Sequence, residues 1–368
     1  MNEAETAMRS YLQRIATGPE LSKNISLEET RHGMQLILDG EADPVQAGIF
    51  LIALRMKRES DDEVRGMLEA IRETTRRVEA NVDDVLDMAD PYDGYNRTLP
   101  ASPFLPAVLA ACGVPAFSQG VHAMGPKFGA THHQVLQAAG IAVDGTPEDV
   151  AARLEDPAIG WGYMDQSLFC PKLYALTALR RLMVKRPALT TTEVLAGPIT
   201  GRKATHLVTG FVHKPYPRIY ALLARHAGYD SALLVRGTEG GIIPSLRQSG
   251  KIWHYHEKGD EKEVDFKPED LGINQELRAV PLPENIPGYR KKTDGVASSV
   301  DASAIAAHAA CAGIDALEGK AGATADSLVY GAALCLWHLQ RYPSLAEAAD
   351  AVRQVLASGK ALSHFKGA

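Results

Sequence analysis

The sequence predicts an α/β protein with a small N-terminal helical domain and a larger α/β domain, whose mostly parallel central sheet is flanked by helices. Its 368 residues suit two domains. Helical patterns fill residues 1–82, and strand–loop–helix units follow from about residue 85. Closely spaced units of this kind favour a parallel sheet with ligand-binding loops at the carboxyl ends of its strands.

The N-terminal helices are marked by their start signals. Ser26, Asp43 and Ser60 are short polar residues that each precede a helical pattern, so we expect them to be N-caps. Residues 48–58, GIFLIALRMKR, are apolar nearly all round the helix. We therefore expect one side of this helix to pack on its own domain and the other to face a partner subunit. The apolar surface assigned to the partner is Leu51, Ile52, Leu54 and Met56.

In the second part of the chain, short apolar runs alternate with helical patterns. The first strand runs into a loop rich in Asp, Gly and Pro at 85–94, and further strands and Ala-rich helices continue to the C-terminus. We expect strands at 114–120, 205–213 and 231–236 and helices at 104–113, 132–140 and 170–186.

Composition and charge exclude several classes of protein. The 39 Lys and Arg residues against 45 Asp and Glu residues give a net charge of −6, and only 6% of residues are aromatic, which disfavours a nucleic-acid binder. The apolar stretches are too short or too interrupted by proline to span a bilayer, so no membrane partner is expected. The start of the chain is polar and acidic, and its four cysteines form no CxxC pair. These features predict a cytoplasmic protein.

The first candidate loop is DPYDGYNRT, residues 90–98. It contains one glycine, a proline and two carboxylates, which favour contacts with hydroxyl groups or a metal over a phosphate cradle made of backbone amides. Arg97 supplies a counter-charge. An Asx-rich turn that caps the next helix is the alternative. No cofactor is certain, but magnesium could be recruited by Asp90, Asp93 or Glu239.

The second candidate loop covers residues 118–133, and the third is RGTEGG, residues 236–241. Glycines in the second loop allow close approach of the backbone to a ligand, and Lys127 with His122 could meet a phosphate or a carboxylate. We expect Lys127 to be exposed, so its removal should leave the melting temperature nearly unchanged; a solvated loop lysine without a ligand is the alternative.

Two histidine pairs are weighed as metal ligands. His132 and His133 are adjacent, so on a helix their side chains diverge by about 100° and do not chelate one ion well. His254 and His256 alternate on one face of a strand, near Glu257. That spacing allows ligand geometry, but an exposed edge strand is the expectation that we favour.

These loops, in this order after a helical start, resemble anthranilate phosphoribosyltransferase and its paralogues over nearly the whole chain. Residues 48–73 resemble the dimer-forming helices of that family, KPEDLGI at 267–273 resembles its Pro-x-x-x-Gly segment, and 316–337 and 344–362 resemble its last helices. The resemblance implies a nucleoside phosphorylase-like fold and a homodimer.

With this resemblance, we place a helical dimerisation domain at 1–83, joined by helices at about 168–196. The α/β ligand-binding domain is placed at 84–167 and 197–368.

The motifs depart from the family pattern in ways that imply a divergent branch. DPYDGYNRT stands where the family has GTGGD, and SQGVH keeps Gly120 of KHGNR but has Ser118, Gln119 and His122 at the other compared positions. Ile242 and Ile243 replace the acidic pair that binds magnesium in the family. Isoleucine cannot ligate a hard cation. Arg180 falls where the family has the arginine that meets the anthranilate carboxylate.

The resemblance therefore implies a pentosyl or phosphoribosyl transferase, or a binder of a small phosphorylated or ribose-containing ligand, whose acceptor is not anthranilate. The alternative is a non-catalytic nucleic-acid or nucleotide-binding protein on the same fold, because some of the divergent branch is thought to bind nucleic acid. No catalytic residue is assigned. The residues expected to line the ligand site are Asp90, Asp93, Gly94, Tyr95, Asn96, Arg97, Thr98, Ser118, Gly120, His122, Lys127, Arg180 and Glu239.

Overall fold

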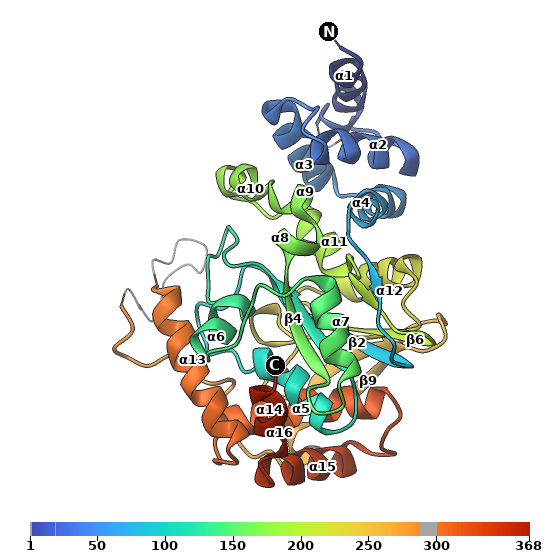
Figure 1. Cartoon of the computed structure of the whole chain (residues 1–368). Coiled ribbons are helices and arrows are strands. Elements are labelled where there is room, and N and C mark those ends of the chain that lie inside the picture. The colour runs from blue at the N-terminus through green and yellow to red at the C-terminus, as the bar shows by residue number, and fades with distance from the viewer. Residues whose placement is uncertain (1, 19, 288–299) are drawn as a thin grey trace.

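The computed structural model describes residues 2–18, 20–287 and 300–368. A small group of helices from the N-terminal part of the chain stands on a larger α/β body (Figure 1). This is the predicted fold class. Within the described residues, no helix is both long and apolar enough to cross a membrane.

The N-terminal helices begin at the predicted caps. The Ser26 and Ser60 hydroxyls accept the backbone N–H groups of Glu29 and Glu63, whose carboxylates in turn accept the backbone N–H groups of the two serines. The Asp43 side chain accepts the N–H of Val45 at the start of the next helix. The four helices are α1 (Glu3–Ile15), α2 (Leu27–Leu38), α3 (Pro44–Lys57) and α4 (Asp61–Glu73).

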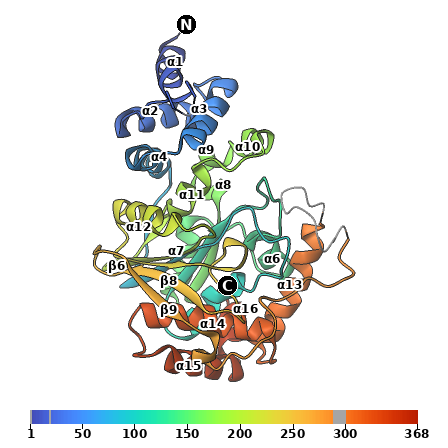
Figure 2. The same ribbon diagram turned by 180° about the vertical axis from the view of Figure 1, so that it is seen from behind.

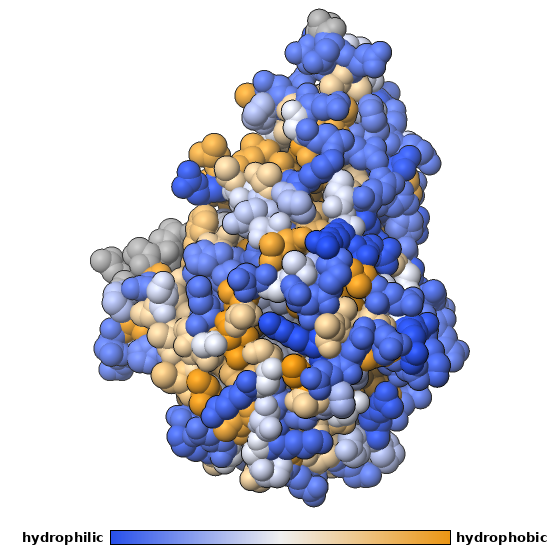
Figure 3. All heavy atoms as spheres, viewed as in Figure 1, coloured by the Kyte–Doolittle hydropathy of each residue, from blue (hydrophilic) through white to orange (hydrophobic). Residues whose placement is uncertain are grey.

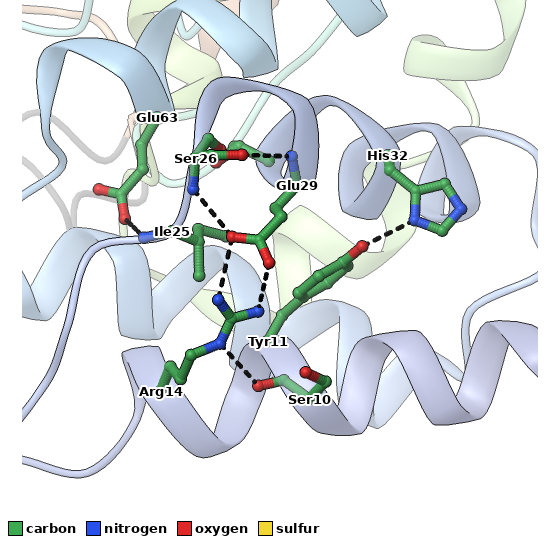
Figure 4. Close-up of polar contacts among 9 residues, drawn as sticks. Ser10, Tyr11, Arg14, Ile25, Ser26, Glu29, His32 and Glu63 are labelled. Atoms are coloured by element: carbon green, nitrogen blue, oxygen red, sulfur yellow. Dashed lines mark hydrogen bonds and ion pairs between the residues drawn. The ribbon is translucent and has the colours of Figure 1, made fainter.

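Glu63 ties three segments of this domain together, and Figure 4 shows its contact with Ile25. Its carboxylate accepts the N–H of Ile25 at 3.0 Å and lies 2.6 Å from Nζ of Lys57, in a pair with exposed fractions of 0% and 4%. A buried charge needs partners of this kind, so Glu63 fixes the entry into α2 against the end of α3. Arg14 and Glu29 add a bidentate contact between α1 and α2.

The central sheet has seven strands in the order β4-β3-β2-β6-β7-β8-β9. The first five are parallel, and β8 and β9 join in antiparallel pairing. The strands are β2 (Asp84–Ala89), β3 (Ala116–Gly120), β4 (Trp161–Asp165), β6 (Ala204–Gly210), β7 (Ser231–Val235), β8 (Gly250–Tyr255) and β9 (Lys262–Phe266).

The sheet is covered on both faces because its strands alternate between two cores. Leu86, Met88 and Val208 pack in one core with helices from the C-terminal part, and Val85 and Leu207 pack in the other. Figure 2 shows α14 to α16 gathered under the sheet. The helices of the α/β body are α5 (Leu105–Ala111), α6 (His132–Ala138), α7 (Pro147–Glu155), α12 (Tyr216–Ala227), α13 (Ala302–Leu317), α14 (Ala323–His338), α15 (Leu345–Ala357) and α16 (Lys360–Lys366), with 3-10 turns η1 (Ser102–Phe104), η3 (Thr238–Gly240) and η4 (Pro268–Leu271).

After β4 the chain returns to the helical domain. α10 contacts α3, and α11 contacts α4. The two segments that link the bodies pair as short parallel strands, β1 (Val78–Glu79) and β5 (Ile199–Thr200). The returning helices are α8 (Gln166–Phe169), α9 (Pro171–Tyr174), α10 (Thr177–Met183) and α11 (Leu189–Thr192), followed by η2 (Glu193–Leu195).

Two sequence predictions about this fold are wrong. Leu51 and Leu54 are fully buried in the helical domain, so they are not part of an exposed apolar face. The strand with His254 is not at the sheet edge, because β9 pairs with its outer side. In both cases, tertiary neighbours cover a surface that the local pattern leaves open.

A buried carboxylate, Asp87, joins β2 to its surroundings. It accepts hydrogen bonds from Gln119 Nε2 at 2.8 and 2.9 Å and from the Tyr229 hydroxyl at 2.7 Å. Burial raises the pKa of Asp87 to about 7, although Tyr229, Gln119 and Arg72 act to lower it. Asp87 therefore keeps its proton in the folded state at pH values where the unfolded chain has lost it.

Asp87→Asn should flatten the pH dependence of stability. The folded-state pKa of Asp87, about 7, lies above the unfolded value of 3.8. The stability that protonated Asp87 contributes to the fold is therefore complete below about pH 4 and is lost as pH rises through 7. The free energy of unfolding of the wild type should fall more steeply over this range, by up to about 1.4 kcal/mol per pH unit, than that of the variant. Urea unfolding at several pH values measures both slopes. The exposed Asp265→Asn is the control, and equal slopes in wild type and Asp87→Asn would contradict the prediction.

Candidate functional site

The three candidate loops meet at the carboxyl ends of the parallel strands. Tyr95, in the loop after β2, forms a β-bridge with Ala130 of the loop after β3. Gly94 lies with φ +71° against the same loop, where a Cβ atom would be 2.5 Å from the carbonyl oxygen of Gly129. Only glycine tolerates both this φ and this contact. The convergence predicted from the topology is present.

Glu239 lies at the point of convergence. Its carboxylate accepts the backbone N–H groups of Asn96 and Arg97 at 3.2 and 2.9 Å. It also accepts the Thr98 hydroxyl at 2.9 Å and lies 2.9 Å from Nζ of Lys127. These four donors, from Asn96, Arg97, Thr98 and Lys127, are called the anion cradle below.

The anion cradle has the chemistry of a phosphate site. Successive backbone amides, a hydroxyl and an ammonium group all point at one pair of oxygens, as donors do around a bound oxyanion. Here the oxygens belong to the protein itself. Glu239 reaches them from a left-handed backbone conformation, φ +55°, which is unfavourable for a residue with a side chain.

The structure corrects the prediction that Lys127 is exposed. Lys127 is 9% exposed, its ammonium group is paired with Glu239, and it lies 5.5 Å from the centre of the Tyr95 ring. Its removal would leave the Glu239 carboxylate buried without its cation. The expectation that the melting temperature would stay unchanged rested on an exposed lysine and therefore loses its basis.

The buried carboxylate of Asp90 holds the loops around the anion cradle together. One of its oxygens accepts the hydroxyls of Tyr95 and Ser102 at 2.7 and 2.6 Å and lies 2.8 Å from Nε2 of His132, and the other accepts the N–H of Ile242 at 3.0 Å. Burial acts to raise the pKa of Asp90, but these contacts outweigh it and hold the pKa below its usual value. Asp90 therefore connects all three loops.

Asp93 and Arg180 are each held by a partner that sequence reasoning missed. Arg186 contacts Asp93 at 2.5 and 3.0 Å, which fastens the segment after α10 to the first loop. Glu193 holds Arg180 by a bidentate contact at 2.6 and 2.7 Å, with both side chains at most 3% exposed. In the sequence, Arg186 belongs to a basic cluster with Arg180, Arg181 and Lys185, whereas no local signal points to Glu193.

The predicted residues of the second candidate loop lie at the end of β3, which holds Ser118 and Gly120, and in the loop after it, which holds His122. His122 is exposed, and its ring lies 5.1 Å from that of His133, whose Nδ1 is 2.9 Å from Asp165 at the end of β4. Ser118 is buried, its hydroxyl has no hydrogen-bond partner among the described residues, and Gly120 lies against Tyr163. His132 and His133 contact different acids, as their predicted divergence requires.

The space beside the first loop is small. A cavity of about 30 Å³, lined by residues that include Tyr95, Thr98 and Ile243, has room for little more than one water molecule. A sugar phosphate needs more room than this. The Glu239 carboxylate already occupies the four donors of the anion cradle, so a ligand that uses them would have to displace it.

Comparison with protein families shows which family the chain belongs to. The helical bundle domain of the glycosyl transferase family matches residues 9–75, and the α/β domain of that family matches residues 93–314. The chain belongs to this family. Within it, the chain is an anthranilate phosphoribosyltransferase-like member.

Similar proteins in this family match two thirds of the chain or more. Anthranilate phosphoribosyltransferase of Thermomicrobium roseum is 27% identical over 97% of the chain and 94% of the relative, and that of Saccharopolyspora erythraea is 31% identical over 68% of each. The Thermus thermophilus enzyme structure has a TM-score of 0.71 at 20% identity and covers 98% of this chain and 97% of its own. The Saccharomyces cerevisiae enzyme in complex with PRPP and Mg has a TM-score of 0.75 at 14% identity, over 99% and 98%.

The magnesium implied by the family resemblance does not fit the residues present. Ile242 and Ile243 stand at the positions of the acidic pair, and the oxygens of Asp90 and Glu239 already accept protein donors. Among the described residues, the acids of this site form no group of three close enough to share an ion.

Lys127→Met should destabilise the fold by about 2 kcal/mol or more, because it leaves a buried carboxylate without its ammonium partner. Urea unfolding measures the change. Glu239→Gln in the same background should recover part of the loss, since it removes the uncompensated charge. The exposed Lys23→Met is the matched control. A variant as stable as the wild type would show that the ion pair contributes nothing.

Proposed function

We propose that this chain binds a phosphorylated ribose ligand at the anion cradle, as a phosphoribosyl transferase-like protein whose acceptor is not anthranilate. The observation that carries the proposal is the convergence of the Asn96 and Arg97 amides, the Thr98 hydroxyl and the Lys127 ammonium group on the Glu239 carboxylate. A phosphate group presents the same oxygens with more charge, so it can replace the carboxylate.

Ligand binding is then an exchange of anions. Glu239 leaves the anion cradle, its backbone is relieved of the left-handed conformation, and the phosphate takes over the four donors. In a transfer reaction, the bond between the anomeric carbon and the leaving diphosphate breaks as the bond to the acceptor forms. Lys127 and the two amides would stabilise the negative charge that collects on the diphosphate. The structurally similar yeast enzyme is described with PRPP and Mg, which supports a donor of this class.

The acceptor argument rests on Arg180. In the family resemblance, this arginine meets the carboxylate of anthranilate. Here both of its terminal nitrogens contact Glu193, in a pair that is almost fully buried. A second carboxylate would have to break this bidentate contact, which is costly in a buried site. An acceptor without a carboxylate suits the site better.

Glu239→Gly should raise the affinity for pyrophosphate or PRPP by about tenfold or more, because it vacates the cradle and removes a competing charge. Glycine also suits φ +55°. Lys127→Met should lower the affinity by a similar factor. Isothermal titration calorimetry measures both changes.

The control is Glu257→Gly, an exposed glutamate with a similar φ of +51° just after β8, at the opposite end of the sheet from the cradle. It should bind as the wild type does. Unchanged affinity in both Glu239→Gly and Lys127→Met would move the ligand site elsewhere. Rapid formation of phosphoribosyl-anthranilate from PRPP and anthranilate by the pure protein would refute the acceptor part of the proposal alone.

Nucleic-acid binding is the competing function, and one observation favours it. The Asp93–Arg186 contact brings together two segments that carry exposed cations, Arg97 on one and Lys185 and Arg186 on the other. The net charge of −6 acts against it. The salt dependence of binding to single-stranded DNA distinguishes nucleic-acid binding from binding of a small phosphorylated ligand. Affinity that depends on contacts with several phosphates falls steeply as salt is added.

We also propose a homodimer through the helical domain. A hollow of about 560 Å³ on α3 is lined almost entirely by apolar side chains and reaches Met183 of α10. Figure 3 shows hydrophobic surface at the upper left, where these helices lie. Large apolar side chains stay exposed there, and a second copy of the chain would cover them. They are Val45, Ile49, Met56, Leu182 and Val184, which are 43–76% exposed.

Met56→Glu with Ile49→Glu should convert the dimer to a monomer, because each places a charge in the apolar contact. Light scattering at micromolar concentration measures the mass, with 39.6 kDa expected for one chain. The control is Leu21→Glu, which alters an apolar residue that is 69% exposed and outside the hollow. A monomeric wild type would overturn the proposal.

A further inference from the structure

A cluster of histidines lies at the end of the sheet opposite to the anion cradle. His254 is in β8 and His256 follows its end, beside the start of β7, while His338 is the last residue of α14. One ring nitrogen of each lies within 4.8 Å of those of the other two. The His256 and His338 rings are stacked with centres 4.6 Å apart.

His338 has one nitrogen fixed and one without a partner. Its Nε2 is 2.9 Å from the Ser231 hydroxyl, which is 2.8 Å from Nδ1 of His206. The residue is only 1% exposed, so its Nδ1 is buried as well. This nitrogen has no hydrogen-bond partner in the described chain. Nδ1 of His254 is likewise buried and unpartnered.

An unpartnered ring nitrogen in this setting calls for a ligand. A neutral imidazole has one donor and one acceptor nitrogen, and a buried polar atom left unsatisfied costs free energy in either tautomer. If Nε2 of His338 donates to Ser231, then Nδ1 offers a lone pair. A ring whose far nitrogen donates to a fixed oxygen is the usual arrangement around a bound metal ion.

The burial of the three histidines and the direction of their pKa shifts agree with binding of a metal ion. Burial, together with the neighbouring His256, His254 and His206, lowers the pKa of His338 well below its usual value. Burial is also the first cause that lowers the pKa of His254 and of His256. The rings are therefore neutral at physiological pH, as a metal ion requires.

We propose that His254, His256 and His338 form a binding site for a divalent transition-metal ion, with zinc as the natural choice. A set made only of imidazoles suits zinc, copper or nickel and not magnesium or calcium. Tetrahedral coordination at about 2.0–2.1 Å brings nitrogens closer together than 4.8 Å, so the rings must turn slightly inward. Three protein ligands leave the fourth position for water or an outside ligand.

A metal ion can reach the histidine cluster from solvent. Its role in stability would not depend on the anion cradle. His254 and His256 are only half-buried, so their side of the cluster reaches solvent. The three ligands link β8 to the end of α14, two segments that are distant in sequence. Bound metal should therefore stabilise the packing of the C-terminal helices on this end of the sheet.

The test is metal binding by untagged full-length protein. Chelator-treated wild type should bind one equivalent of Co²⁺ and show the visible absorption of tetrahedral cobalt, which Zn²⁺ displaces, and Zn²⁺ should raise its melting temperature. His254→Gln and His256→Gln should each weaken Zn²⁺ binding by more than about 100-fold, since loss of a ligand exceeds the usual cost of losing an outer partner. Both sites are partly exposed, so these variants should fold.

His308→Gln is the matched control, because His308 is exposed on α13 outside the cluster. It should bind Co²⁺ and Zn²⁺ as the wild type does. Ser231→Ala should weaken Zn²⁺ binding by about 10–100-fold by freeing the His338 ring. A wild type that binds no metal, or His254→Gln and His256→Gln variants that bind as tightly as the wild type, would overturn the proposal. Pyrophosphate affinity should stay unchanged in all of them.

Discussion

The buried carboxylate of Asp90 is the contact on which the candidate site depends. Four donors from Tyr95, Ser102, His132 and Ile242 meet its two oxygens, and they come from the loops after β2, β3 and β7. A carboxylate without solvent must be satisfied by the protein, so the loops cannot separate without a large cost. This constraint fixes the positions of the loops, and with them the positions of the donors in the anion cradle.

Both positions where the site could hold an outside anion are occupied by the chain's own acids. Glu239 fills the anion cradle and Glu193 holds Arg180. The donors thus remain arranged for an anion while carboxylates of the protein occupy them. Under the proposed function, binding would be an exchange between internal and external anions, for which the small space beside Thr98 is no obstacle.

The two ends of the sheet carry different chemistry. At the carboxyl ends of the parallel strands, amides, a hydroxyl and an ammonium group surround an anion position, and at the opposite end three histidines surround an unpartnered ring nitrogen of the described chain. The antiparallel addition of β8 makes this possible, because it brings His254 and His256 beside the start of β7. Donors for an anion and imidazole nitrogens for a metal ion are thereby kept at opposite ends of the sheet.

The sequence by itself determined the fold class, the helix starts and the loops that converge, because caps and hydrophobic periodicity are local properties of the chain. Ser26, Ser60 and the strand before Asp90 are examples. Only the tertiary structure decided how the charges are used. Lys127 is buried against Glu239, Arg180 against Glu193, and His254 against His338, in pairs separated by 112, 13 and 84 positions in the chain. Burial and pairing of a polar side chain depend on neighbours that packing supplies, and no local pattern specifies them.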